Sequence, residues 1–380
     1  MSKPKKSGPQ VRTNFIGKLY KINPVYCLYF VILVLFSIYS YTQIDLNLTL
    51  FNHPWWNNFR SFVIQIGYFQ RNLSVAIYLF FIAALFVLQF FALKKKLSGL
   101  KLAVVIGGIC LFSYPFLSHD FFNYIFDARI LTFYGKNPYF YKALDFPADP
   151  FIRFMQWTHR TYPYGPVFLL VTAIPSFLSF GKFILNYFLF KAMFVFFYLL
   201  MVYFTDKINK KWALILAVNP LIIVEGLMSS HNDLVALSLS LIGVYFIFRE
   251  KNLPARLFLV LSGGIKYASL PLIVLSKKYK LFNYVALLGI VAGFIYLIKM
   301  EIQPWYFLML FSFIPFMENL VVGLNIFFAG LLFSYYPYVA YGGWDKPYKV
   351  AVKHDIIIAF AVLNLVYFGF LKLLKPKKTD

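Results

Sequence analysis

The residues of this chain that could do chemistry gather just beyond the end of an apolar run. Residues 117–139 read LSHDFFNYIFDARILTFYGKNPY and combine acids, a histidine, an arginine and several aromatic side chains. If a helix begins at Asp120, then Asn123, Tyr124 and Asp127 follow at i+3, i+4 and i+7, so all four share one helical face. We expect this face and the adjacent His119 to line a cavity. The alternative is an interfacial helix whose polar side is merely hydrated.

A second polar cluster ends another apolar run. The sequence SSHND contains His231, Asn232 and Asp233, and the preceding run contains an acid, Glu225. Glu225, Ser229 and Asn232 fall at 0, +4 and +7, which predicts one stripe leading from the membrane to this cluster. An acid at the membrane centre costs roughly 2.5–3.5 kcal/mol on insertion scales, so it is a candidate for a site. The alternative is a protonated carboxyl that hydrogen-bonds a neighbouring helix.

Two cations could meet an anionic ligand. Lys266 lies between Gly264 and Pro271, and a lysine at membrane depth needs either a protein carboxylate or an anion such as a lipid phosphate. Arg129 is a second candidate, although it falls on the helical face opposite Asp120 and could instead bind lipid headgroups. The same region supplies three further cations, Lys136, Arg153 and Arg160.

Two stiff aromatic turns complete the candidate site. Residues 162–166 read YPYGP and residues 303–306 read QPWY. Tyr164, Trp305 and Tyr306 could stack on a sugar ring. The alternative is that these side chains form part of the aromatic belt found at any membrane interface.

The composition defines the class of protein that must position these residues. Of the 380 residues, 61% are hydrophobic and 13% charged, and the mean hydropathy is +0.70, which indicates an integral membrane protein. The net charge of +23 is spread over short basic tracts, at 94–96, 210–211 and 377–378, as in cytoplasmic loops. This scatter argues against nucleic-acid binding. We expect a single transmembrane domain spanning 1–380.

The apolar runs predict an all-α helix bundle with about ten crossings and both termini in the cytoplasm. A crossing needs about 20 apolar residues. The predicted crossings are 24–43, 72–93, 99–118, 183–205, 212–229, 234–249, 281–299, 305–320, 321–340 and 354–373.

Two further segments do not fit a simple crossing. Residues 166–181 are short and interrupted by proline, which predicts an interfacial helix following an outer catalytic loop at 119–165. Residues 256–276 carry Gly-Gly and a proline, which predicts a re-entrant hairpin of two half-helices with Lys266 near its turn. Broken helices at membrane depth line protein-enclosed cavities, so both segments point to a site.

The sequence contains no nucleotide-binding or hydrolase motif of the types GxxxxGK[ST], GxGxxG, HExxH or GxSxG. We therefore expect no cofactor, and the ligand types require no metal. Asp120, Asp127, His231 and Asp233 nevertheless have oxygen and nitrogen donors that could coordinate a divalent ion.

These motifs, in this order, resemble a known enzyme class. An acid after a helix exit, a loop ending in GKNPY, then YPYGP, NPLIIVEGLMSSHND and GGIKYASLP are together similar to the GT-C integral-membrane glycosyltransferases. The likeness is greatest to polyprenyl-phosphate-mannose-dependent mannosyltransferases and glycosyltransferase family 87. The resemblance implies that Asp120 is the catalytic acidic residue, which would act as general base on the acceptor hydroxyl, and that His231, Asn232 and Asp233 line the cavity. It also implies that Lys266 meets the donor phosphate.

The chain departs from this family in two ways. It has two crossings ahead of the helix that delivers Asp120, and it lacks the doubled acid of some relatives.

We expect an enzyme of the cell membrane that is in contact with membrane lipids. It would move a sugar, mannose by resemblance, from a polyprenyl phosphate to a glycan or glycolipid acceptor on the outer face. The rival is a secondary transporter or lipid flippase using buried Glu225 and Lys266, and a third reading is a non-catalytic assembly subunit.

Overall fold

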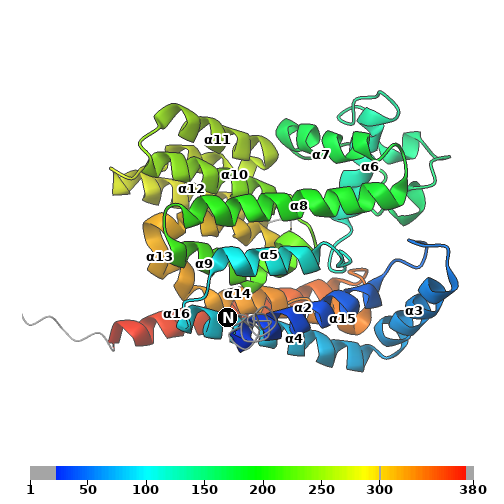
Figure 1. Cartoon of the computed structure of the whole chain (residues 1–380), viewed down its shortest axis with the longest axis horizontal. Coiled ribbons are helices and arrows are strands. Elements are labelled where there is room, and N and C mark those ends of the chain that lie inside the picture. The colour runs from blue at the N-terminus through cyan, green and yellow to red at the C-terminus, as the bar shows by residue number, and fades with distance from the viewer. Residues whose placement is uncertain (1–22, 299–300, 374–380) are drawn as a thin grey trace, which may run out of the picture.

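The computed structural model describes residues 23–298 and 301–373, and within these ranges the chain is helical without a strand (Figure 1). The predicted all-α class is therefore confirmed for the part of the chain described. The predictions for the two termini and for the basic tract at 377–378 lie outside these residues. The α-helices are α2 (Pro24–Ser40), α3 (Pro54–Ile64), α4 (Arg71–Lys94), α5 (Gly99–Cys110), α6 (Asp120–Thr132), α7 (Pro166–Leu178), α8 (Phe183–Asp206), α9 (Lys210–Val218), α10 (Asp233–Phe248), α11 (Asn252–Ile265), α12 (Lys280–Ile298), α13 (Ile314–Gly323), α14 (Asn325–Phe333), α15 (Tyr336–Tyr341) and α16 (Pro347–Leu373).

The ten predicted crossings are not confirmed as a set. Five helical spans in the described residues are long and apolar enough to cross a membrane, and all five coincide with predicted crossings. These five are Pro24–Gln43, Arg71–Lys94, Phe183–Asp206, Pro304–Gly323 and Pro347–Phe370. A sixth is possible if α9 and the π-helix η5 (Ile222–Met228), which meet at a bend of 68°, count as one span.

The remaining predicted crossings correspond to shorter helices. The run 99–118 is helical only to Cys110, because Pro115 cannot continue a helix and the chain turns before it. The run 321–340 is divided between α14 and α15, with Pro337 at the start of the second helix. Hydropathy counts apolar residues along the chain, and it does not register these breaks.

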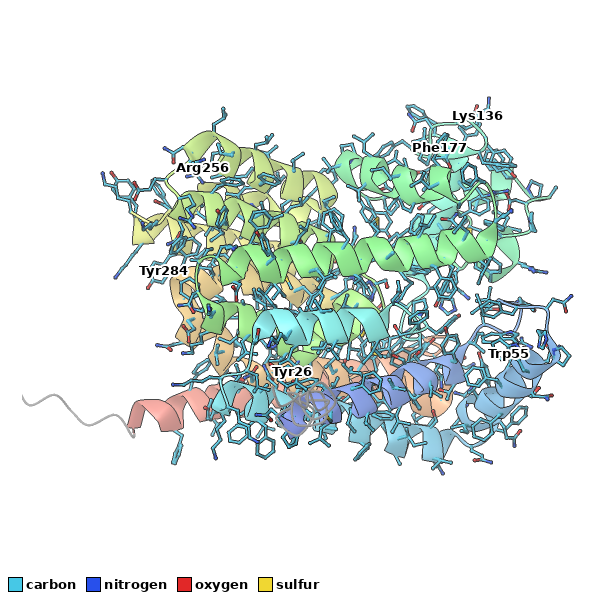
Figure 2. All side chains as sticks on the ribbon, in the orientation of Figure 1. Tyr26, Trp55, Lys136, Phe177, Arg256 and Tyr284 are labelled. Carbon is cyan, nitrogen blue, oxygen red and sulfur yellow. The ribbon has the colours of Figure 1, made fainter. Side chains whose placement is uncertain are left out.

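The long helix α8 organises the bundle. It packs against α5, α7, α9 and α10, and in Figure 1 it runs across the middle of the molecule. Many large apolar side chains are exposed around the bundle, among them Trp55 and Tyr284, which Figure 2 shows at its periphery. An apolar surface of this extent is typical of a protein that contacts lipid.

The predicted hairpin at 256–276 is present as α11 followed by the 3₁₀-helix η6 (Tyr267–Val274). Lys266 lies between the two helices in an extended conformation. The Arg256 guanidinium donates to the carbonyl of Ile273 and, at 2.8 Å, to that of Leu275, so the two arms return to the same level. Lys266 therefore stands at the turn, as the sequence predicted.

The aromatic turn at 162–166 packs directly on this hairpin. Gly165 donates its N–H to the carbonyl of Ile265 at 3.3 Å, and a Cβ at Gly165 would overlap the carbonyl of Gly264. This close backbone approach requires glycine. Helix α7 begins at the next residue, where the sequence predicted a helix, and its position at a membrane interface remains a prediction.

Candidate active site

Helix α6 begins at Asp120, as predicted from its periodicity. The Ser118 hydroxyl accepts the Asp120 N–H at 3.2 Å, and an acid in the first helical turn is favoured by the helix dipole. The hydrated polar face considered as an alternative is wrong, because Asn123 is 4% and Asp127 7% exposed. The polar face of α6 looks into the protein.

Asp120 meets His231, which comes from a distant part of the chain. The Asp120 Oδ2 lies 3.8 Å from His231 Nδ1, and His231 Nε2 lies 3.4 Å from Glu225 Oε2. The imidazole is stacked on Trp305, with ring centroids 3.9 Å apart and planes 14° apart. The histidine is thus held between two acids while an aromatic ring supports its plane.

Lys266 adds a cation to the same group of residues. Its Nζ donates to Asp233 Oδ2 at 2.8 Å and lies 4.8 Å from the centre of the Tyr306 ring. The side chains of Asp120 and Lys266 keep 15% and 17% of their surface exposed, whereas those of His231 and Glu225 are completely buried. A substrate would therefore reach Asp120 and Lys266 first.

The local environment alters the acidity of two carboxyls of α6. Burial raises the pKa of Asp120 above its usual value, and the positive charges of Arg160 and Lys266 oppose this increase. Burial also raises the pKa of Asp127 to about 8, again opposed by Arg160. A carboxyl with a raised pKa is a better proton acceptor when it is ionised.

The corner that carries His231 is built by a break in the helix. Proline follows Asn219 at the break, and the Asn219 side chain accepts the Leu221 N–H at 3.0 Å. The π-helix η5 then ends near Ser230, whose φ of 60° lies in the left-handed region. This conformation is rare for a residue with a side chain and turns the chain sharply toward α6.

Lys191 of α8 forms hydrogen bonds to this corner, and sequence reasoning missed this residue. Its buried Nζ donates to the carbonyls of Leu227 and Met228 at 2.7 and 3.0 Å, and to the hydroxyls of Ser113 and Ser230, both at 3.1 Å. The signal that could have found it is a lone lysine in the middle of a 24-residue apolar helix.

Several other predicted residues join the cluster. The Tyr124 hydroxyl accepts the Asn232 N–H at 3.5 Å, and the Tyr124 ring lies edge-on to Tyr164 with centroids 5.1 Å apart. Asn123 shares the buried face of α6 with Asp120. The elements that the sequence analysis identified thus converge here. They are α6, the turn at 162–166, the 229–233 corner, the hairpin and the start of η7 (Pro304–Phe313).

Two predicted residues lie elsewhere. The guanidinium of Arg129 forms an ion pair with Asp149, with Nε donating to Oδ2 at 2.6 Å. His119 turns toward Asp45, with 3.9 Å between Nε2 and Oδ2. The structure therefore does not bring Arg129 and His119 together with the cluster around Asp120.

Sequence reasoning also missed a group of hydrogen bonds beside the QPWY turn. The Lys353 ammonium donates to Glu301 Oε1 and Gln303 Oε1, each at 2.8 Å. These residues come from the last third of the chain, and nothing in their local sequence indicates the contact.

The cluster contains many buried polar atoms without a hydrogen bond among the described residues. They are Asn123 Oδ1, both carboxyl oxygens of Glu225, Ser229 Oγ, both ring nitrogens of His231, Asn232 Nδ2 and Asp233 Oδ1. Each such atom costs about 1–3 kcal/mol when it is left unmet. Their concentration here is typical of a site that water or a polar ligand completes. In residues 23–298 and 301–373 no three His, Cys, Asp or Glu side chains are arranged to hold a metal ion.

Comparison with known proteins identifies the family. No curated protein and no solved structure matches the chain. The model of the alpha-(1->6)-mannopyranosyltransferase family, N-terminal domain, matches residues 52–292, which is more than half of the chain and includes Asp120, His231 and Lys266. This confirms the resemblance to mannosyltransferases of the GT-C class. The chain belongs to the alpha-(1->6)-mannopyranosyltransferase family and is a glycosyltransferase with several membrane helices.

Proposed function

We propose that this chain transfers mannose from a polyprenyl phosphate to a hydroxyl of a glycan or glycolipid acceptor on the outer face of the cell membrane. The observation that carries the proposal is the position of Asp120. Its Oδ2 lies 3.8 Å from His231 Nδ1, and its carboxyl interacts electrostatically with Lys266 and Arg160. A carboxylate that can take a proton thus lies beside cations that can hold a phosphate. The family supplies the class of reaction.

Asp120 is the general base in this proposal. It removes the proton of the acceptor hydroxyl, a role typically worth 10²–10⁴ in rate. His231 stands behind it, and its second ring nitrogen faces Glu225 at 3.4 Å. The stacked Trp305 fixes the plane of the imidazole, so His231 can orient Asp120 or accept its proton.

The step is a single displacement. The acceptor oxygen forms a bond to the anomeric carbon while the bond from that carbon to the phosphate oxygen breaks, and the electron pair leaves with the polyprenyl phosphate. The acceptor proton goes to Asp120. One displacement inverts the configuration at the anomeric carbon.

Lys266 meets the leaving phosphate in this proposal. The phosphate gains about one negative charge as the bond breaks, so a nearby cation stabilises the transition state more than the ground state. Lys266 already pairs with Asp233 at 2.8 Å and keeps part of its surface accessible. Arg160 is the second cation that acts on Asp120.

The distribution of basic residues supports the outer face. Helix α4 ends at Lys94, and α9 begins at Lys210, in two of the basic tracts that mark cytoplasmic ends of helices. Asp120 lies one helix beyond the first tract, past the end of α5. The polyprenyl tail explains why the reaction takes place in a membrane protein without a nucleotide motif.

The test is transfer by purified protein. Each of a panel of short-chain polyprenyl-phosphate sugars is offered with candidate acceptors, and the products are weighed by mass spectrometry. The proposal expects product with the mannosyl donor and a shift of one hexose on the acceptor. Transfer from a nucleotide sugar alone would overturn it, and so would uptake into liposomes without transfer, which would support the rival transporter.

A further inference from the structure

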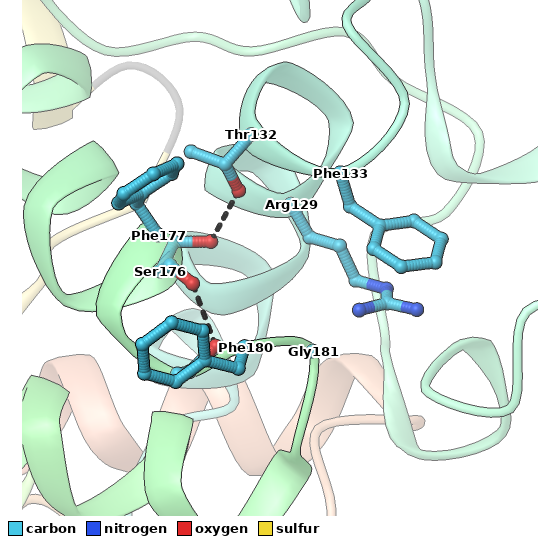
Figure 3. Close-up of a pocket in the computed structure, with 8 residues that line it drawn as sticks. Arg129, Thr132, Phe133, Ser176, Phe177, Phe180 and Gly181 are labelled. Carbon is cyan, nitrogen blue, oxygen red and sulfur yellow. Dashed lines mark hydrogen bonds between the residues drawn. The ribbon is translucent and has the colours of Figure 1, made fainter.

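A pocket outside the candidate active site lies between the C-terminal ends of α6 and α7. It has a volume of about 190 Å³ (Figure 3). Its wall contains one guanidinium, three hydroxyls and exposed aromatic rings. The lining residues are Arg129, Thr132, Phe133, Ser176, Phe177, Ser179, Phe180 and Gly181. The glycosyltransfer mechanism uses none of them.

Arg129 brings an unused hydrogen-bond donor to this pocket. Its Nε donates to Asp149, but Nη1 is buried and meets no acceptor among the described residues. Nη1 lies beside Gly181, since a Cβ on that glycine would be 3.6 Å from it. The Phe133 ring, 58% exposed, covers the guanidinium at 3.8 Å, and the Phe151 ring lies 4.4 Å from it, so a ligand would reach Nη1 only if the exposed Phe133 ring turned aside. A phosphate oxygen is the acceptor that a guanidinium fork suits best.

The rest of the pocket favours a positive group. Both helices end here, α6 at Thr132 and α7 at Leu178, and helix C-termini carry partial negative charge. The hydroxyls of Thr132 and Ser176 lie 2.7 Å apart, and because the Thr132 hydroxyl donates to the Ala128 carbonyl, the Ser176 hydroxyl donates to Thr132 and keeps its own oxygen free to accept. Aromatic faces such as that of Phe180 also attract cations.

The surface next to the pocket is apolar. Leu170, Ile174 and Phe177 are 66%, 63% and 67% exposed. They follow one another at i, i+4 and i+7, so they form a single stripe along α7. The stripe ends at the pocket, because Phe177 belongs to both. A ligand that uses the stripe and the pocket together must have an apolar tail and a polar head.

We infer that this pocket binds a zwitterionic phospholipid, with its phosphate on Arg129 Nη1, its ammonium at the ends of α6 and α7, and an acyl chain along the α7 stripe. The Arg129 charge is already neutralised by Asp149, so a head without net charge fits better than an anionic one. This site is separate from the sugar-transfer reaction, and its test needs no activity.

The test is retention of lipid by the purified full-length protein, measured by native mass spectrometry. Phosphatidylethanolamine and phosphatidylglycerol with the same acyl chains are compared. The wild type should retain one phosphatidylethanolamine about two- to fivefold more strongly than phosphatidylglycerol, the size of effect that one exposed cation–aromatic contact supplies. Equal retention of the two lipids, or retention of neither, would overturn the inference.

Two variants and one matched control locate the lipid. Arg129→Lys keeps a cation for Asp149 but loses the second donor, and Phe180→Ala removes an aromatic wall. The control is Phe140→Ala, since Phe140 and Phe180 are both 78% exposed and Phe140 is not in the pocket. Both pocket variants should lose the lipid while the control keeps it. If Arg129→Lys fails to fold, Phe180→Ala alone tests the position of the lipid. Lipid retention by Phe180→Ala equal to that of Phe140→Ala would contradict the proposed position.

Discussion

Two buried polar regions lie side by side at the broken helix η5, and they differ in how their hydrogen bonds are met. Lys191 has four acceptors within 3.1 Å, two carbonyls and two hydroxyls. Only a few residues away, Glu225 and His231 are equally buried, but their carboxyl oxygens and ring nitrogens have no hydrogen bond among the described residues. Satisfied polar groups fix a structure, and unsatisfied ones are available to a substrate. The comparison therefore separates a structural region from a functional one.

The largest effect is expected at Asp120. Asp120→Asn keeps the shape of the side chain and removes the base, so transfer should fall by about 10²–10⁴ with little change in the free energy of unfolding. Turnover of the mannosyl donor by purified enzyme measures this. The control is Asp145→Asn, an exposed acid in the same segment between α6 and α7, which should retain wild-type turnover. Equal turnover in the two variants would remove Asp120 from the mechanism.

Lys266→Met should have the next largest effect, a loss of about 10²–10³ in kcat if the ammonium stabilises the leaving phosphate as an oxyanion donor does. The variant also leaves Asp233 without its partner. A double variant with Asp233→Asn removes both charges and should recover stability but not turnover. Recovery of turnover would show that the pair is only structural.

Lys191→Met should act mainly on stability. It removes four buried hydrogen bonds, to the carbonyls of Leu227 and Met228 and to the hydroxyls of Ser113 and Ser230, which should lower the free energy of unfolding by about 1–3 kcal/mol. Thermal or denaturant unfolding of the purified protein measures this change. Because the corner carries His231, kcat should fall while KM for the donor is retained. An unchanged midpoint would abolish the distinction between the two regions.

Glu225→Gln tests the other region, in which the buried polar atoms lack hydrogen bonds. It replaces a buried carboxyl that makes no hydrogen bond among the described residues with a neutral amide of the same shape. Stability should stay the same or rise, because a buried amide costs about as much as a protonated carboxyl and less than an ionised carboxylate. Transfer should fall, but by less than in Asp120→Asn. A loss of stability comparable to that of Lys191→Met would place Glu225 in the structural region.

The smallest effect at neutral pH is expected at Asp127. Burial raises its pKa in the folded protein to about 8, above the ordinary value of 3.8, so the folded state binds the proton more tightly than the unfolded state. The protonated Asp127 carboxyl therefore makes its full contribution to the free energy of unfolding below pH 3.8, and this contribution is lost as the pH rises toward 8. Asp127→Asn should remove this part of the pH dependence of unfolding. An identical slope in the variant and the wild type would contradict the raised pKa.

The sequence predicted those parts of the site whose conformation is determined by neighbouring residues in the chain. The start of α6 at Asp120 follows from helical periodicity, and the turn at Lys266 follows from the glycines and proline around it. The prediction for Arg129 relied on residue type, although its helical position already placed it on the other face. Lys353 reaches Glu301 and Gln303 only through the packing of α16, which no local feature encodes.

The count of ten crossings is not confirmed, for a related reason. Runs of apolar residues identify segments that can be buried, but a buried segment need not be one continuous helix. The bend of 68° after α9, at Asn219-Pro220, and the end of α5 at Cys110 both occur inside runs that are apolar enough on average to be predicted as crossings. Proline and a left-handed residue such as Ser230 decide where each helix stops.

The most direct test of the central claim is a structure of the protein with a non-hydrolysable polyprenyl-phosphate mannose analogue bound. The account predicts the phosphate within hydrogen-bonding distance of Lys266 Nζ and the anomeric carbon facing Asp120, with His231 still stacked on Trp305. A sugar phosphate bound away from Lys266, or an anomeric carbon separated from Asp120 by protein, would contradict it.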